Sequence, residues 1–241
     1  MADKIDVVFQ DDSMLVINKP AGLLSIPDRF NTNAPHVKAL LEPKYGKLFT
    51  VHRLDKFTSG LIILAKSEIA HKLLSETFEQ RRLIKKYVAI IHGVLPQNQG
   101  SIELAIAEDP TQKGKYKVHP KGKKSRTDFI VLESWSNYSF VELNIFSGRT
   151  HQIRVHLSHI GRPIVADALY SASDQLMLSA IKGKRYQLNR SGEEKPILSR
   201  QALHASSLEF RHPISENELH LEAPIPKDMV ATIKQISKWD R

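Results

Sequence analysis

The chain contains no cysteine. This absence excludes disulfide bonds, thiolate nucleophiles and zinc sites built on sulfur, and it fits a reducing compartment. Long apolar runs are missing as well, since a stretch such as LIILA at 61–65 is far shorter than the roughly 20 residues that span a bilayer. The first twenty residues carry acids among short apolar pieces, unlike a signal peptide. We therefore expect a cytoplasmic protein without membrane association.

Several motifs of known chemistry are also missing. Neither G-x-x-x-x-G-K-[ST] nor G-x-G-x-x-G occurs, so nothing supports a phosphate-binding or dinucleotide-binding loop, and the nucleophile elbow G-x-S-x-G is absent too. HRLD at 52–55 differs from the kinase sequence H-R-D-L because its aspartate comes one place later and no asparagine follows at the required spacing. A carboxylate is then the group left to act as nucleophile or base.

Three histidines lie in one predicted helix and call for a test as metal ligands. Of His151, His156 and His159, only His156 and His159 share a helical face. No carboxylate stands at a supporting position of the kind found in H-E-x-x-H. We therefore expect no metal site and assign these side chains polar or capping roles.

The charge is strongly positive, with 35 Lys and Arg against 26 Asp and Glu and a net charge of +9. Such a balance favours a polyanionic partner, nucleic acid before phospholipid, although a basic surface that is merely solvated is an equal alternative. Two basic, turn-rich stretches at 113–126 and 179–196 could contact phosphates or could be loops that charge keeps in solution.

Strand-like segments outnumber helices. The alternation in FVELNIF at 140–146, for example, predicts a strand with one buried face. Strands are expected at 5–9, 14–18, 61–65, 87–92, 102–107, 129–133, 140–146, 203–210 and 219–222, and helices at 67–80, 150–160 and 227–238. Because strands and helices do not alternate regularly, we expect an α+β fold with a mixed, mostly antiparallel central sheet, flanking helices and basic loops.

The three predicted helices have recognisable ends or apolar stripes. Ser67 is a candidate N-cap, with Ile69, Leu73 and Leu74 forming the apolar stripe behind it. The helix at 150–160 should end at Gly161. The 241 residues, 41% of them apolar, contain no repeat or long linker, and we expect one domain spanning residues 1–241.

One carboxylate is distinguished by its surroundings. In VHRLDKFTSG at 51–60, Asp55 stands between Arg53 and Lys56, just before a Thr-Ser-Gly turn. It is either the neutralising member of a surface charge cluster or a reactive group that cations keep ionised. A hydrolase acting on glycosides would normally require a second carboxyl nearby, and no second acid is marked in this way.

Four segments in order resemble the signature segments of the RluA-type pseudouridine synthases. They are HRLDKFTSGLIILAKS at 52–67, KKYVAIIHG at 85–93, SGRTHQIRVHLSHIGRPIVADALY at 147–170 and ALHA at 202–205, and NKPAGLLSIP at 18–27 fits as well. The sequence departs from the family where Ala166 and Ser171 replace glycines, which affects local loop shape. The resemblance covers almost the whole chain and implies a pseudouridine synthase fold.

The resemblance implies an RNA isomerase that detaches uracil from the ribose C1′ and rejoins it through C5, without cofactor or metal. Asp55 would be the essential carboxylate, acting either as a nucleophile at C1′ or as a base at C2′. Arg149 would pair with Asp55, and Tyr87 would stack on the uracil and assist proton transfer. Arg53 would occupy the space left by the flipped uridine, and Ile153 would form an apolar wall of the pocket.

Basic residues near these segments are expected to contact RNA phosphates. They are Arg81, Arg82, Lys85, Lys86 and Arg154, together with the two basic loops. The substrate class would be a stem-loop in rRNA or tRNA, bound by a monomer. The resemblance begins about six residues into the chain, so we expect no N-terminal S4 domain. The alternatives are an RNA-binding or ribosome-assembly protein that keeps the fold without turnover, and a nucleoside hydrolase.

Overall fold

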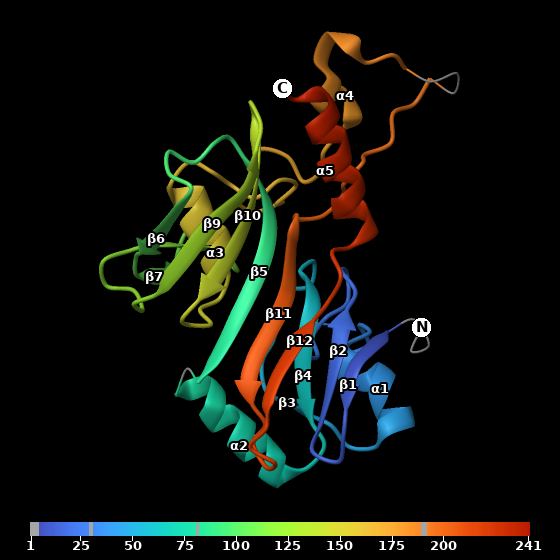
Figure 1. Ribbon diagram of the computed structural model, residues 1–241, viewed down its shortest axis with the longest axis vertical. Helices are drawn as coiled ribbons and strands as arrows, with labels where there is room; N and C mark the ends of the chain where they lie inside the picture. Colours follow the sequence, from blue (N-terminus) through green and yellow to red (C-terminus); the bar gives the residue numbers. More distant parts are fainter. Residues whose placement is uncertain (1–4, 29–30, 81, 189–191) are drawn as a thin grey trace. The chain divides into compact units, whose positions relative to one another are not determined.

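The computed structural model describes residues 5–28, 31–80, 82–188 and 192–241 (Figure 1). The chain forms two compact units, the first from Met1–Lys86 and His204–Pro224, the second from Tyr87–Leu203 and Ile225–Arg241. The boundaries fall within strands, so β5 and β11 contribute residues to both units. A single catalytic domain over the whole chain stays a prediction.

The first unit contains a sheet in the order β1-β2-β4-β11, to which β3 adds beside β4 and β12 beside β11. The pairs β1–β2, β2–β4, β3–β4 and β11–β12 are antiparallel, and β4 and β11 are parallel. The elements are β1 (Asp6–Gln10), β2 (Met14–Lys19), α1 (Val37–Tyr45), β3 (Phe49–Thr50), β4 (Ser59–Ala65), α2 (Glu68–Glu79), the start of β5 (Leu83–His92), β11 (Leu203–Arg211) and β12 (Glu218–Glu222).

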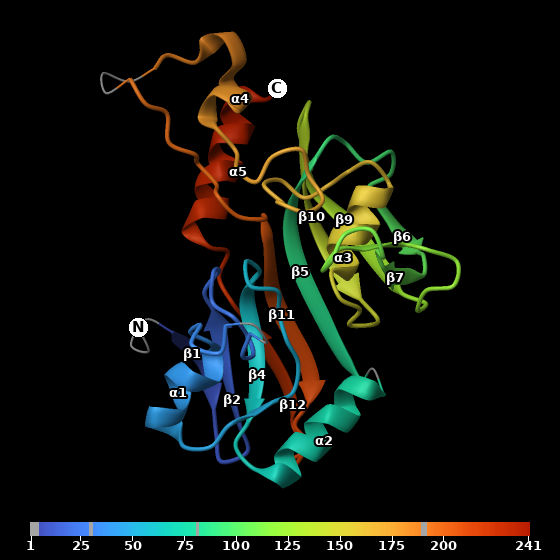
Figure 2. The ribbon, with the colours of Figure 1, turned by 180° about the vertical axis from the view of Figure 1, so that it is seen from behind.

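The central strands β2 and β4 of the first unit are buried on both faces. Leu15 and Ile17 pack with α1, while Met14 and Val16 belong to the opposite cluster that α2 joins. Figures 1 and 2 both show α1 next to β1 and β2. Two covered faces explain why the sequence of β4 is a continuous apolar run instead of an alternating one.

Helix α2 begins at the N-cap predicted for it, but its buried stripe differs from the predicted one. The Ser67 hydroxyl oxygen accepts a hydrogen bond from Ala70 N at 3.2 Å. Ala70 and Leu74 are the buried residues, whereas Ile69 is 71% exposed. Ala70, the next residue after Ile69, faces the core, and its small side chain permits close packing. The prediction that Ile69 belongs to the buried stripe of α2 was therefore wrong.

The second unit contains the strand order β5-β10-β9-β6 and a separate hairpin of β7 and β8. Its elements are β6 (Gln99–Glu103), β7 (Ile106–Glu108), β8 (Tyr116–Val118), β9 (Arg126–Ser134), β10 (Tyr138–Ile145), α3 (Gln152–His159), α4 (Leu178–Lys182), the short 3-10 helix η2 (Gly183–Arg185) and α5 (Lys227–Trp239). The strand predicted at 102–107 is divided, because Ile106 leaves the main sheet to pair with Val118. The predicted α+β class with a mixed, mostly antiparallel sheet is confirmed.

Helix α3 is enclosed by the second unit along most of its length. Residues 152–157 are all buried. The helix follows His151, which has a left-handed φ of 56°, and it is followed by Gly161 at φ 72°. Among the residues that the structure describes, no helix combines the length and apolar character needed to cross a membrane.

Candidate active site

The loop that carries Asp55 connects β3 to β4 in the first unit. Asp55 is half-buried, and its carbonyl oxygen accepts a hydrogen bond from Thr58 N at 3.1 Å, which closes the turn. Arg53 and Lys56 are exposed on either side. The loop therefore presents one partly sheltered carboxylate between two accessible cations.

A fully buried lysine holds this loop from the preceding segment NKPAG. The Lys19 ammonium donates hydrogen bonds to the carbonyl oxygens of Pro20 at 3.1 Å, Leu23 at 2.8 Å and Lys56 at 3.1 Å. The Lys56 carbonyl oxygen also accepts from Gly22 N at 2.8 Å. Carbonyl oxygens satisfy an ammonium that burial would otherwise penalise, so Lys19 fixes the backbone next to Asp55.

Ser25 holds the other side of Asp55. Its hydroxyl donates to the Leu54 carbonyl oxygen at 2.8 Å and accepts from Leu54 N at 3.0 Å. Both neighbours of Asp55 are thus bonded to residues 19–25. We refer to the contacts of Lys19 and Ser25 with Leu54 and Lys56 as the loop clamp.

The end of the loop is fixed by close contact between β4 and β11. Gly60 pairs with Ala205, has φ +113°, and a Cβ at this position would lie 2.2 Å from the Ala205 carbonyl oxygen. Only glycine fits there. Beside it, Ser59 Oγ lies 2.9 Å from His204 Nδ1, and His204 Nε2 lies 3.2 Å from the Ala223 carbonyl oxygen. The ALHA segment therefore supports the turn that follows Asp55.

His52 anchors the beginning of the loop. Its Nε2 accepts a hydrogen bond from Ile63 N at 3.0 Å, which leaves Nδ1 as the protonated nitrogen of a neutral ring. The ring stacks on Phe78 of α2, with 4.6 Å between the centroids. Burial lowers the pKa of His52 to about 3, and the nearby Lys85 ammonium acts in the same direction. His52 is a neutral structural group, not a proton donor.

Lys85 does not have the accessibility that a phosphate contact requires. The residue is 9% exposed, and its ammonium lies 5.4 Å from the centroid of the Phe78 ring. Its predicted role as a phosphate ligand is therefore wrong for this placement, because the aliphatic stem and the ring cover it. Two other basic residues were predicted to contact phosphates here: Arg82 is exposed, and the Lys86 ammonium lies 4.0 Å from the Glu209 carboxylate. Arg81, also predicted, lies outside the described residues.

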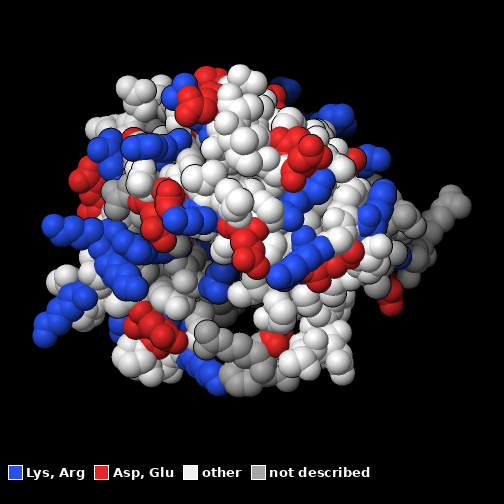
Figure 3. Space-filling model, turned by 90° about the horizontal axis from the view of Figure 1, so that it is seen from below, with Lys and Arg blue, Asp and Glu red and all other residues white. Residues whose placement is uncertain are grey.

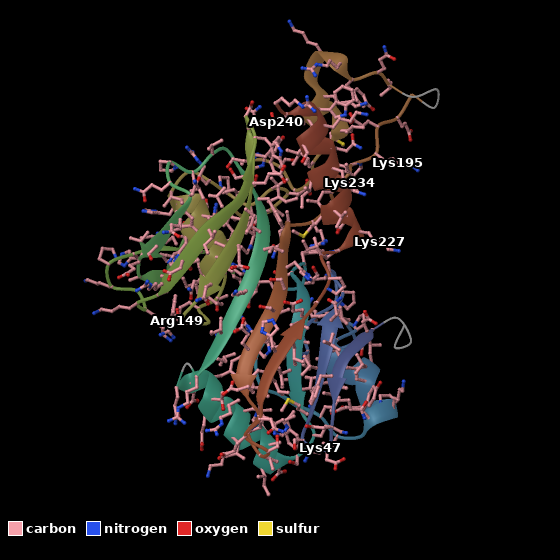
Figure 4. All side chains as sticks on the ribbon, in the orientation of Figure 1. Lys47, Arg149, Lys195, Lys227, Lys234 and Asp240 are labelled. Atoms are coloured by element: carbon pink, nitrogen blue, oxygen red, sulfur yellow. The ribbon has the colours of Figure 1, made fainter. Side chains whose placement is uncertain are left out.

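The turn that carries Arg149 connects β10 to α3 in the second unit (Figure 4). The buried Gln152 amide organises it: the side-chain oxygen accepts from Ser147 Oγ at 2.6 Å and from Arg149 N at 3.3 Å. Its nitrogen donates to the Arg126 carbonyl oxygen at 2.9 Å and to Thr127 Oγ1 at 3.1 Å. Gln152 thus ties the turn to β9.

Gln152 was not among the predicted site residues, although it lies in the signature segment. A buried amide within a polar turn was the available signal, but sequence could not show which donors and acceptors surround it. The backbone of Arg149 is held by this amide, while Arg149 Nε is buried without a hydrogen-bond partner among the described residues. A donor of the guanidinium therefore remains for a further group.

Arg154 has a structural role in place of the predicted phosphate contact. Its Nε donates to Asp167 Oδ2 and its Nη2 to Asp167 Oδ1, both at 2.7 Å, and both residues are buried. The guanidinium also lies over the Tyr170 ring, 4.9 Å from its centroid. Assigning Arg154 to RNA was therefore wrong: its planar fork is engaged by a carboxylate of the same unit.

His156 is a buried connector between α3 and the strand β9. Its Nδ1 lies 2.9 Å from Thr127 Oγ1, and its Nε2 lies 3.0 Å from Ser125 Oγ. Burial lowers the pKa of His156. Across the described ranges, no three His, Cys, Asp or Glu side chains gather closely enough to hold a metal ion.

The remaining predicted site residues lie in the second unit. Tyr87 is the first residue of that unit, on β5, and is 8% exposed. Ile153 is buried on α3, in the turn of helix after Arg149. Asp55 and Arg53 belong to the first unit. How Asp55, Tyr87 and Arg149 act together stays a prediction.

Charge alone does not mark a binding surface on the face that Figure 3 shows. On the face shown in Figure 3, Lys and Arg side chains are interspersed with Asp and Glu. Exposed Arg53 and Lys56 next to a half-buried carboxylate are a more specific feature than the net charge of +9. The loop combines a candidate reactive group with cations that can contact a polyanion.

Comparison with known proteins shows the family to which the chain belongs. The family described as RNA pseudouridylate synthase matches residues 13–159. Ribosomal large subunit pseudouridine synthase D of Haemophilus ducreyi is 33% identical over 247 residues, covering 96% of this chain and 70% of that protein. The Bacillus subtilis protein named uncharacterized RNA pseudouridine synthase YhcT is 36% identical, covering 94% and 70%.

One solved structure is similar to this chain in both fold and sequence. Human RNA pseudouridylate synthase domain containing 4 superposes with a TM-score of 0.72 at 28% identity, covering 96% of this chain and 93% of the human chain. The chain belongs to the RNA pseudouridylate synthase family. It is an isomerase that converts uridine in RNA to pseudouridine, and the resemblance read from its signature segments is confirmed.

Proposed function

We propose that this pseudouridine synthase modifies uridine in RNA of the large ribosomal subunit. Support comes from the Haemophilus ducreyi relative, which is named for that subunit and is similar over 96% of this chain. The substrate would be a uridine in a stem-loop, where bases can be flipped out of the stack. Such a substrate would place the enzyme in the cytoplasm, and we expect it to act as a monomer.

Within this function, Asp55 is the essential carboxylate. The observation that carries this assignment is the loop clamp, which bonds the residues on both sides of Asp55 to residues 19–25. A catalytic group must be held within a fraction of an ångström of its productive position, and buried backbone contacts provide that precision. A surface charge cluster would need no buried lysine beneath it.

The isomerisation needs no net change in atoms. The bond from C1′ to N1 breaks, the bond from C1′ to C5 forms, C5 loses its proton and N1 gains one. Asp55 would act as a nucleophile at C1′ or as a base at C2′, and both routes require its ionised form. Either route also needs shelter from water once the uridine is bound.

Arg149 and Tyr87 are assigned supporting roles at the reacting groups. Arg149 would pair with Asp55 and keep it ionised, and the unsatisfied Nε supplies a donor for such a partner. Tyr87 would stack on the flipped uracil, with its hydroxyl in proton transfer. Arg53, exposed in the loop, would fill the space that the uridine leaves in the RNA.

Arg149→Lys tests the pairing because it keeps the charge but loses the planar fork. Loss of one charge-assisted hydrogen bond predicts a decrease in kcat of about 10- to 100-fold with KM little changed. Tyr87→Phe should likewise lower kcat more than RNA affinity. An equal loss of rate and affinity in Tyr87→Phe would instead indicate that this tyrosine is structural.

The substrate is tested with unmodified transcripts of large-subunit rRNA, small-subunit rRNA and tRNA. Each is incubated with the enzyme, and pseudouridine is mapped by its chemical reactivity. The proposal expects product at defined positions of the large-subunit transcript. Product only in tRNA would overturn the substrate assignment. RNA binding without product would favour the non-catalytic alternative, and release of free uracil would favour a hydrolase.

A further inference from the structure

We propose that α4, η2 and the C-terminal turn of α5 form a second RNA-binding surface, which contacts phosphates outside the target uridine. The surface comprises Trp239 with Lys182, Lys184, Arg185 and Lys238, and we call it the Trp239 surface. All of these residues lie in the second unit. The proposal rests on RNA as the substrate, but not on Asp55 as the catalytic group.

Three cations converge on one indole ring. The ammonium groups of Lys182 and Lys238 lie 4.7 and 5.0 Å from the centroid of Trp239, and the Arg185 guanidinium lies 5.9 Å from it. Lys184 adds a fourth exposed cation in η2. Trp239 is half-buried, so part of the ring remains accessible. A cluster of this kind provides charge for phosphates and an aromatic face.

Among the described residues, none of the four cations of the Trp239 surface forms an ion pair, and the two acids nearby are bonded to other groups. The acid next in sequence, Asp240, accepts from Asn137 N at 2.7 Å and from Asn137 Nδ2 at 2.6 Å. Glu194 accepts from Ser179 N at the start of α4 at 2.7 Å. Cations that are not held in ion pairs repel one another, and a bound polyanion would relieve that repulsion.

The surface stands on a fixed frame. Asp228, in the first turn of α5, receives two hydrogen bonds from the Arg200 guanidinium, at 2.6 and 2.8 Å. At the other end, Asp240 is bonded to Asn137 in the turn before β10. Figures 1 and 2 show α4 beside α5. The helix that carries Lys238 and Trp239 is therefore fixed at both ends before any ligand binds, which lowers the entropic cost of binding.

Helix α5 extends the positive charge beyond the Trp239 surface. Lys227, Lys234 and Lys238 follow each other at spacings that place them on one helical face. Figure 4 shows Lys227 and Lys234 along α5. A row of cations along a helix matches the spaced charges of a nucleic acid backbone.

The occupant is RNA, not a lipid surface. A helix that lies on a membrane needs a free apolar face. The apolar residues Met229 and Ile236 of α5 are instead buried in the second unit. What α5 offers to a ligand is its basic side and one indole.

The test compares two variants with equal loss of charge. The first is Lys182→Gln, Arg185→Gln, Lys238→Gln. The control is Lys38→Gln, Lys44→Gln, Lys47→Gln around α1, where Lys38 and Lys47 already face Glu42 and Glu68 at 3.4 Å. Binding of a uridine-containing RNA hairpin with single-stranded tails is measured over a range of salt concentrations.

Each phosphate contact contributes roughly 0.7 to 0.9 to the magnitude of the slope of log K against log salt, where K is the association constant for RNA. The triple variant at the Trp239 surface removes three such contacts, so the magnitude of its slope should be smaller by about 2 to 3. The control should change by less than about 0.5. Equal slopes for the Trp239 variant and the wild type would overturn the proposal. So would equal slope losses in the two variants, since net charge would then be the cause.

A second measurement leaves the cluster intact. The chain has two tryptophans, so Trp135→Phe makes Trp239 the only indole and its fluorescence a local probe. The RNA hairpin should protect Trp239 from quenching by acrylamide. Absence of protection at saturating RNA, or protection by phosphatidylglycerol vesicles in place of RNA, would refute the assignment. Because neither readout requires pseudouridine formation, these failures are distinct from failure of the catalytic proposal.

Discussion

Replacement of Lys19 by methionine should damage both stability and catalysis. Lys19→Met keeps the length of the side chain but removes an ammonium that donates to the carbonyl oxygens of Pro20, Leu23 and Lys56. The Lys56 oxygen keeps its bond from Gly22 N. The change therefore removes the donor from the buried Leu23 carbonyl and from the partly exposed Pro20 carbonyl, and it loosens the backbone beside Asp55.

The magnitude follows from those two carbonyl groups. An unsatisfied buried acceptor costs about 1 to 3 kcal/mol. Part of that cost is offset because methionine is easier to bury than a charged ammonium. We expect a loss of about 2 kcal/mol, most of it from the buried Leu23 carbonyl, which lowers the urea midpoint by about 0.7 to 1 M at an m-value of roughly 2 to 3 kcal/mol/M.

Catalysis should decrease further than folding alone explains. A shift of the loop by about 1 Å can cost on the order of 100-fold in rate, so kcat should fall about 10- to 100-fold under conditions where the variant is folded. RNA affinity should change little, because Lys19 is fully buried. Single-turnover formation of pseudouridine, compared with RNA binding by filter retention, separates the two effects.

Lys47→Met is the matched control. Its ammonium is largely exposed and lies 3.4 Å from Glu68, and such surface pairs contribute about 0.5 kcal/mol or less. Lys47→Met should therefore keep the wild-type midpoint and rate. If Lys19→Met matched this control in both stability and kcat, the loop clamp would not position Asp55.

Three further predictions concern the same framework. Gly60→Ala should cost about 3 kcal/mol or more in urea unfolding, whereas Gly22→Ala, whose Cβ meets open space, should cost only about 1 kcal/mol for its positive φ. Because the pKa of His52 is lowered from 6.5 to about 3, the unfolded chain takes up the proton first. Stability should fall as pH decreases from about 6.5 towards 3, and His52→Gln should weaken that fall in urea midpoints. Arg154→Met should cost about 3 to 5 kcal/mol by leaving Asp167 buried and unpaired, with an unchanged salt slope of RNA binding; a reduced slope would restore Arg154 as a phosphate ligand.

Much of the fold could be predicted from local patterns. Every strand predicted from apolar runs or alternation corresponds to one in the structure, except that the segment at 102–107 is shared between β6 and β7. The missed helix α1 contains Pro43 and buries only Val37 and Leu41, so neither propensity nor periodicity indicated it. Short elements whose stability depends on distant partners leave little local signal.

The site could be predicted only in part, because buried polar contacts depend on distant residues. Lysine is rarely buried, so no pattern in the sequence placed Lys19 in the interior. One of the carbonyl oxygens that accept from its ammonium belongs to Lys56, 37 residues later in the chain. Arg154 could not be told from a phosphate ligand without Asp167 beside it. A signature segment suggested chemistry at Asp55, whereas the contacts by which Lys19 and Ser25 hold its loop could be identified only from the structure.

The proposed role of Asp55 as the essential carboxylate is tested most directly by removing its charge. Asp55→Asn keeps the shape of the side chain and removes its charge and nucleophilicity, and Asp12→Asn is an exposed control in the same unit. The decisive measurement is pseudouridine formed in a single turnover on unmodified large-subunit rRNA. The prediction is wild-type product with Asp12→Asn and none with Asp55→Asn, at equal RNA binding; product at the wild-type rate from Asp55→Asn would contradict it.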